Sequence, residues 1–149
     1  MKTRLLLLVM TIIFSVGFVN AQKIIESQVP AEVKAKFQSL NPNIKDVVWR
    51  KSKKGTYEAE FKQGKSSYSV TMDSVGNFKE KEMEMKVSEL SKEIHDYVAK
   101  NYPGYKLTEA SQITYADGKP MYEAEITKGK DKFDLLFDST YNYIKKGHF

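Results

Sequence analysis

The chain has 149 residues and a formal net charge of +5, from 24 Lys and Arg against 19 Asp and Glu. It contains no cysteine, which excludes disulfides, cysteine metal sites and an anchor on a lipidated thiol. Because Lys and Glu are interleaved, as in residues 79–82, the mild basic excess is typical of a solvated surface and does not predict a nucleic-acid partner.

Residues 1–21 predict an export signal. Lys2 and Arg4 form its positive start, residues 5–19 are almost wholly apolar, and Val19-Asn20-Ala21 supplies small residues at the cleavage positions. We expect cleavage after Ala21 and a periplasmic or secreted protein without stable membrane insertion. A retained anchor is the alternative, but the apolar run is shorter than the roughly 20 residues that cross a bilayer.

The elements that follow predict one helix and four short strands. After a lead-in at 22–28, Val29, Val33, Phe37 and Leu40 recur at helical spacing, and Pro42 should end this helix at Asn41. In the second strand Tyr57, Ala59 and Phe61 alternate with polar residues, which is typical of a strand with one buried face. The fourth strand changes phase along its length, which predicts a bulge. The expected strands are 44–50, 56–62, 66–72 and 78–85.

The second half of the chain repeats the first. Tyr57-Glu58-Ala59-Glu60-Phe61 returns as Tyr122-Glu123-Ala124-Glu125-Ile126, an offset of 122 − 57 = 65. Pro42 and Pro103 are 61 residues apart, so the second copy holds four extra residues between Gly104 and Tyr122, for which the loop at 116–120 is the natural place.

A second helix is expected from Ser88, a plausible N-cap, with a buried stripe of Leu90, Ile94 and Val98, ending at Tyr102. The strands after it are expected at 110–115, 121–127, 132–137 and 142–146.

These patterns predict an α+β fold, a tandem repeat of a helix plus a four-stranded antiparallel meander. We assign residues 22–86 to the first repeat and 87–149 to the second. One layer of about 60 residues is marginally stable alone. The two sheets should therefore join edge to edge into one curved sheet, with the helices on one face and the other face open to water.

Four glutamates form the sharpest candidate site. Glu58 and Glu60 share one strand face about 7 Å apart, and Glu123 and Glu125 repeat them. Paired carboxylates can do acid–base chemistry, hold calcium or receive a basic partner. Catalysis needs a pKa shifted by burial, whereas this face should be wet, so we interpret it as either a solvated surface or a partner-binding one.

Aromatic residues at turns or strand ends are further candidates for partner binding, namely Trp49, Tyr115 and Tyr141. Trp49 could equally belong to the core. His95 and His148 lack zinc-site spacing, and neither a nucleophile elbow nor a phosphate loop is present. We therefore predict no enzyme activity, no metal and no cofactor.

The doubled helix-plus-meander behind an export signal, with its Tyr-Glu-Ala-Glu strand, Gly-Lys turn and Asp-Ser hairpin, resembles the PepSY-like, β-lactamase-inhibitor-like family of exported bacterial proteins. The absence of cysteine departs from the disulfide-stapled β-lactamase inhibitor. The resemblance implies a non-catalytic periplasmic binding module, of the kind that inhibits a protease or another hydrolase, with its open sheet face on a protein or peptide of the cell envelope. The alternative is a small-ligand-binding or structural envelope protein.

Overall fold

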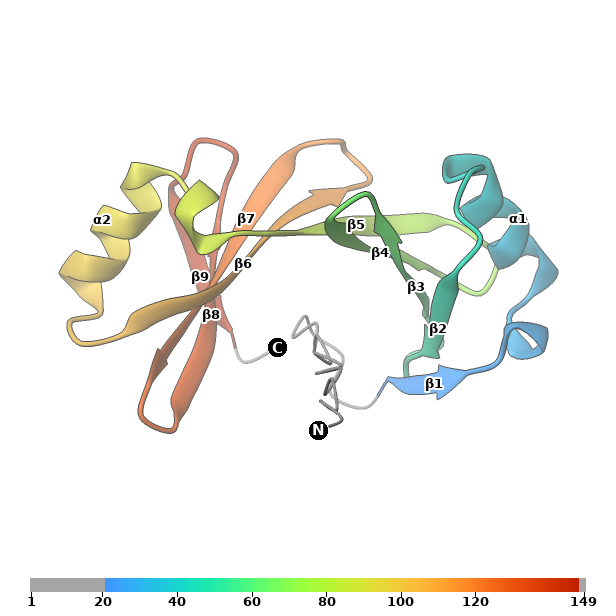
Figure 1. Cartoon of the computed structure of the whole chain (residues 1–149), viewed down its shortest axis with the longest axis horizontal. Helices are drawn as coiled ribbons and strands as arrows, with labels where there is room; N and C mark the ends of the chain where they lie inside the picture. Colours follow the sequence, from blue (N-terminus) through green and yellow to red (C-terminus); the bar gives the residue numbers. More distant parts are fainter. Residues whose placement is uncertain (1–20, 148–149) are drawn as a thin grey trace, which may run out of the picture.

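The computed structural model describes residues 21–147, so the expected signal at 1–20 lies outside the described part of the chain. Nine strands form one antiparallel sheet in which each strand pairs with the next along the chain (Figure 1). The strands are β1 Gln22–Ile24, β2 Val47–Lys51, β3 Tyr57–Gln63, β4 Ser66–Met72, β5 Phe78–Met85, β6 Lys106–Tyr115, β7 Pro120–Lys128, β8 Asp131–Phe137 and β9 Tyr143–Gly147. The helices are α1 Ala31–Leu40 and α2 Lys92–Asn101, preceded by the 3-10 turns η1 Glu26–Gln28 and η2 Val87–Glu89.

The sheet is arched, with α1 and α2 on the outer side of its two limbs (Figure 1). The predicted α+β tandem architecture is confirmed, with the short strand β1 added at the first edge. The repeat boundaries at 22–86 and 87–149 stay predictions. No helix within residues 21–147 has the length and apolar character needed to cross a bilayer.

Helix α1 packs on the sheet through Val33 and Phe37, which are both buried. Pro30 has an extended ψ of 146° at the N-cap, so the helix begins at Ala31. It ends at Asn41 as predicted, where the backbone N–H donates to the Phe37 carbonyl. Leu40 is 46% exposed, so its expected place in the buried stripe is wrong.

Helix α2 repeats this packing with Ile94 and Val98. Its N-cap is Ser91, whose hydroxyl accepts a hydrogen bond from the Ile94 N–H at 3.4 Å. The predicted cap at Ser88 is wrong because that residue belongs to the turn η2. The predicted end at Tyr102 is confirmed.

Each copy has its own apolar core between helix and sheet. In the first, Phe37 meets the rings of Trp49 and Phe61 edge to face, both at 5.4 Å between centroids. In the second, Tyr97 of α2 stacks on Tyr143 at 4.9 Å. Burial of such rings is the main source of stability in a cysteine-free chain.

Strands β5 and β6 join the two copies through six residue pairs, from Glu80 with Tyr115 to Met85 with Ala110. The four extra residues of the second copy lie in the β6–β7 hairpin, because Trp49 pairs with Ala59 whereas Ala110, 61 residues after Trp49, pairs with Ala124, 65 residues after Ala59. They lengthen both strands instead of only the loop. The longer β6 can therefore pair with β5 and β7 at once.

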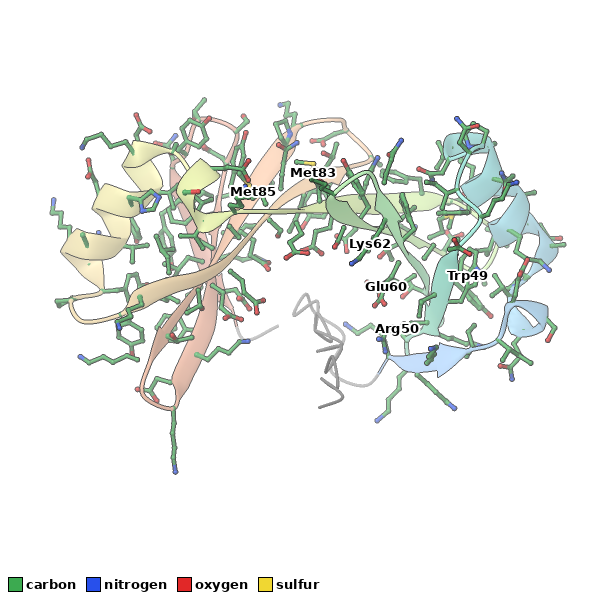
Figure 2. The ribbon with its side chains drawn as sticks, in the orientation of Figure 1. Trp49, Arg50, Glu60, Lys62, Met83 and Met85 are labelled. Carbon is green, nitrogen blue, oxygen red and sulfur yellow. The ribbon has the colours of Figure 1, made fainter. Side chains whose placement is uncertain are left out.

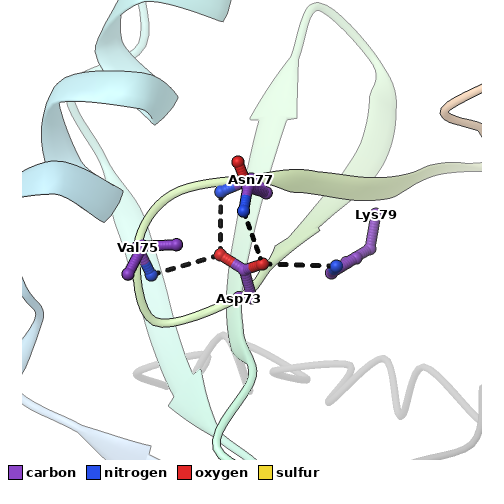
Figure 3. A network of polar contacts seen from close by, with 4 residues as sticks. All are labelled: Asp73, Val75, Asn77 and Lys79. Carbon is purple, nitrogen blue, oxygen red and sulfur yellow. Dashed lines mark hydrogen bonds and ion pairs between the residues drawn. The ribbon is translucent and has the colours of Figure 1, made fainter.

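Both copies close with the same bulged hairpin. The register shifts opposite Met72 and again opposite Phe137, which confirms the predicted bulge in β5. In the first hairpin Asp73 accepts hydrogen bonds from the backbone N–H groups of Val75 at 3.1 Å and Asn77 at 2.9 Å, and it lies 3.2 Å from Lys79 Nζ (Figure 3). These donors hold the pKa of the Asp73 carboxyl down at about 2.

Candidate functional site

The sheet face opposite the helices carries a continuous acidic surface. Glu58 of β3 pairs with Thr71, which in turn pairs with Glu80 of β5. Residues that pair directly across antiparallel strands point to the same side of the sheet. The same holds one step along the strands, where Ser69 lies between Glu60 and Glu82.

The register carries this surface into the second copy. Ser111 lies between Glu84 and Glu123, and Glu125 lies between Glu109 and Asp134. The structure thus brings the four predicted glutamates onto one surface, which we call the concave face. Its acidic residues are Glu58, Glu60, Glu80, Glu82, Glu84, Glu109, Glu123, Glu125 and Asp134.

Figure 2 shows the orientation directly. Glu60, Arg50 and Lys62 point into the hollow of the arch, whereas Trp49 points toward α1. The acids of β5 and β8 were missed from the sequence, because β5 changes phase and Asp134 is a single acid in an otherwise apolar strand.

The expectation that the glutamates face open water is wrong. Glu58 is 4% exposed, Glu123 7% and Glu125 4%, while Glu60 is half-buried. On the inner side of an arched sheet the side chains of neighbouring strands converge, so each carboxylate is screened by those beside it.

Burial changes the acidity of the central carboxyls. It is the largest cause that raises the pKa of Glu58 to about 7, followed by the charge of Glu60. Burial also raises the pKa of Glu82 to about 8, and the pKa of Glu123 to about 9, with the charge of Asp134 next for Glu123. The middle of the concave face therefore holds protons near neutral pH and would gain from a nearby cation.

Basic partners lie toward the two limbs. Arg50 Nε donates to Glu60 Oε1 at 2.5 Å in the first copy. In the second, Lys132 pairs with Glu125, which also accepts from the Thr108 hydroxyl at 2.7 Å. In contrast, the charged neighbours that raise the pKa of Glu82 and Glu123 are all acidic.

Thr71 lies at the centre of the first copy's acids. Its side chain is directed onto the concave face between Glu58 and Glu80, and it is only 5% exposed. Within residues 21–147 its hydroxyl has no hydrogen-bond partner. A buried hydroxyl without a partner is costly, so this position is suited to a group supplied from outside.

The aromatic candidates separate into three environments. Tyr115 lies on the concave face beside Glu80, half-buried, and burial is the first cause that raises its pKa. Trp49 is 5% exposed in the first core, so its assignment to a partner surface is wrong and the core alternative is confirmed. Tyr141 packs on Tyr122 at 5.1 Å in the second core, on the helix side of the sheet.

Other chemistry has less support. The described residues contain no group of three or more His, Cys, Asp or Glu arranged to hold a metal ion. His95 Nε2 lies 3.2 Å from the Val87 carbonyl and so fixes η2 against α2, while His148 lies outside the described part of the chain. Two hollows of about 400 and 770 Å³ lie at the outer end of the first copy, lined by residues such as Pro42, Ile44 and Val47, and not over Glu82 and Glu123.

An arched antiparallel sheet with two outer helices and an acidic inner surface defines a scaffold of the PepSY-like, BLIP-like class. No protein-family model and no curated protein matches the sequence. The fold is shared with solved Bacteroides structures, which confirms the resemblance expected from the repeat motifs.

Three solved structures illustrate the likeness. A DUF2874 family protein from Bacteroides ovatus is 14% identical, with a TM-score of 0.70, covering 79% of this chain and 86% of its own. A BLIP-like protein from Bacteroides fragilis is 18% identical, with a TM-score of 0.65, covering 79% and 85%. A protein from Bacteroides eggerthii, described as a candidate periplasmic protein, is 14% identical, with a TM-score of 0.71, covering 80% and 88%. At such identities the likeness concerns the fold alone.

Proposed function

We propose that this protein is a non-catalytic binding protein of the cell envelope, and that its concave face binds a protein or peptide. The observation that carries the proposal is the row of buried carboxyls, Glu58, Glu82 and Glu123, which runs across both copies of the repeat. Inhibition of an envelope protease or another hydrolase is the form of binding that the BLIP-like fold suggests.

The extent of the surface favours binding over catalysis. An acid–base pair acts on one bond and is usually found in a cleft, whereas these carboxyls occupy alternate strands from β3 to β7. The raised pKa values follow first from burial, which any tightly shielded acid would show. A surface of this length instead fits a segment of polypeptide.

Location in the periplasm, or outside the cell, is part of the proposal. It is supported by the predicted signal at 1–21 and by the description of the Bacteroides eggerthii protein that shares the fold.

Photo-crosslinking tests the proposed surface. A crosslinking amino acid replaces Tyr115 on the concave face, or Val75, which is exposed at the hairpin tip beside α1. Crosslinking in intact cells should join a protein partner to position 115 and leave position 75 unreacted. Partners found at 75 but not at 115 would eliminate the concave face as the binding surface.

A further inference from the structure

We propose that the occupant of the concave face is an extended basic segment of a partner protein, whose Arg or Lys side chains contact Glu58, Glu82 and Glu123. This inference rests on the proposed function and names the chemical class of the partner.

Charge complementarity is the first argument. Glu82 is buried among Glu58, Glu80 and Asp134, and Glu123 is buried among the same acids of β5 and β8. A guanidinium or ammonium group placed there would favour the ionised carboxylates and relieve their mutual repulsion. Arg suits the site best because its planar group can contact two carboxylate oxygens at once.

The Thr71 hydroxyl is a second, independent argument. It is buried, directed onto the same face, and without a partner among the described residues, between Glu58 and Glu80. A hydroxyl oxygen accepts hydrogen bonds, and Arg and Lys only donate them. A basic side chain seated between the two glutamates would therefore satisfy Thr71 as well.

The spacing of the carboxyls points to a chain segment and not to a single ion. Glu58, Glu82 and Glu123 stand on β3, β5 and β7, so each is two strands from the next, or about 10 Å across the sheet. A polyproline-type segment rises about 9 Å every three residues and presents every third side chain to the same side. Basic residues at positions i, i+3 and i+6 would match the three carboxyls.

Synthetic peptides test this inference on the protein purified after export. The probe is a fluorescent peptide with Arg at every third position in a Pro- and Ser-rich background. One comparison peptide has Gln in place of each Arg, and another has the same Arg residues in one contiguous block. Binding is measured by fluorescence anisotropy at physiological salt. The spaced-Arg peptide should bind at least tenfold more tightly than the Gln peptide and more tightly than the block peptide.

Two triple variants make the assignment specific. Glu58→Gln, Glu82→Gln and Glu123→Gln together should weaken binding of the spaced-Arg peptide at least tenfold. Glu26→Gln, Glu32→Gln and Glu93→Gln change the net charge equally at exposed positions in η1, α1 and α2, and should leave binding unchanged. Thermal melting of both variants shows whether each is folded, and removing buried repelling charges should not lower Tm.

The outcomes separate this inference from the proposed function. Equal binding to the wild type and to the concave-face variant would overturn the basic-segment proposal. So would binding of Ca²⁺ alone that is lost in the same variant while no peptide binds. If position 115 still crosslinks a partner although the spaced-Arg peptide does not bind, the proposed function stands and only the basic chemistry falls.

Discussion

Gly76 and Tyr141 occupy the same left-handed position in two hairpins that lie 141 − 76 = 65 residues apart, with φ angles of 84° and 66°. A β-carbon on Gly76 would lie 2.9 Å from the Glu32 carbonyl oxygen of α1, so the first hairpin tip rests on the helix backbone. Tyr141 instead faces the ring of Tyr122 at 5.1 Å. The neighbour of each turn therefore decides which residue the turn can hold.

Replacing Gly76 should destabilise the first copy. In Gly76→Ala the methyl group must displace the helix backbone and also adopt a positive φ, at an expected cost of about 1–3 kcal/mol in the free energy of unfolding. Gly55→Ala is the control, because Gly55 has φ 83° and nothing within 4 Å of its added β-carbon. Urea denaturation should show the larger loss for Gly76→Ala; equal losses would remove the helix contact from the explanation.

The two aromatic candidates should behave in opposite ways. Trp49→Ala leaves a void beside Phe37 and should lower the free energy of unfolding by about 3–5 kcal/mol. Tyr115→Ala, on the concave face, should change stability by less than about 1 kcal/mol but weaken partner binding. Chemical denaturation and binding to the crosslinked partner measure the two effects, and a stable Trp49→Ala protein would contradict the core assignment.

Stability should fall as the pH rises through neutrality. Glu58, Glu82 and Glu123 have folded-state pKa values of about 7, 8 and 9, above the unfolded value of about 4.3. Between these values the folded protein keeps protons that the unfolded chain has released, so raising the pH favours unfolding. One pKa unit corresponds to about 1.4 kcal/mol, so Glu58 alone should cost on the order of 3 kcal/mol between pH 5 and pH 9. Urea titrations across this range that show rising stability would contradict the buried-acid assignment.

Neutralising one central carboxyl should remove part of this dependence. Glu123→Gln should raise the free energy of unfolding at pH 9 and change it little at pH 5, since the carboxyl is already protonated there. Glu125→Gln is the matched control two residues along β7. It loses the ion pair to Lys132 and weakens the hydrogen bond from Thr108, so it should destabilise instead. The opposite order of the two variants at pH 9 would show that burial of Glu123 has been misassigned.

Shortening the β6–β7 hairpin should weaken the junction between the copies. Removing residues 114–115 and 120–121 takes away the pairs of Tyr115 with Glu80 and Thr114 with Lys81. We expect the single unfolding transition of the intact chain to broaden or divide, because each copy alone is marginally stable. Calorimetry measures this change, and an unaltered transition would mean that the extra residues do not support the junction.

The sequence was sufficient for the architecture because the repeat supplied every local signal twice. The interval of 61 between Pro42 and Pro103 and of 65 between Tyr57 and Tyr122 located the extra residues before any strand was paired. Strand β1 was missed because three residues show no alternation, and it forms only by pairing with Trp49–Lys51.

The candidate site was only partly predictable. Alternation shows which face Glu58 and Glu123 take, but the depth of burial depends on how the sheet bends across many strands, which no local pattern records. Glu82 and Asp134 became visible only through pairing in the assembled sheet. Hydrophobic pattern thus predicts the side of a residue, while its acidity depends on the tertiary fold.

The bulged five-residue strand β9 gives the array a natural end. An unpaired β6-like strand would invite another repeat to dock, but β9 offers only five residues, and its register is broken at Phe137. Two repeats therefore make a closed count, and head-to-tail growth of these molecules into fibres is disfavoured by the same irregularity that shapes each hairpin.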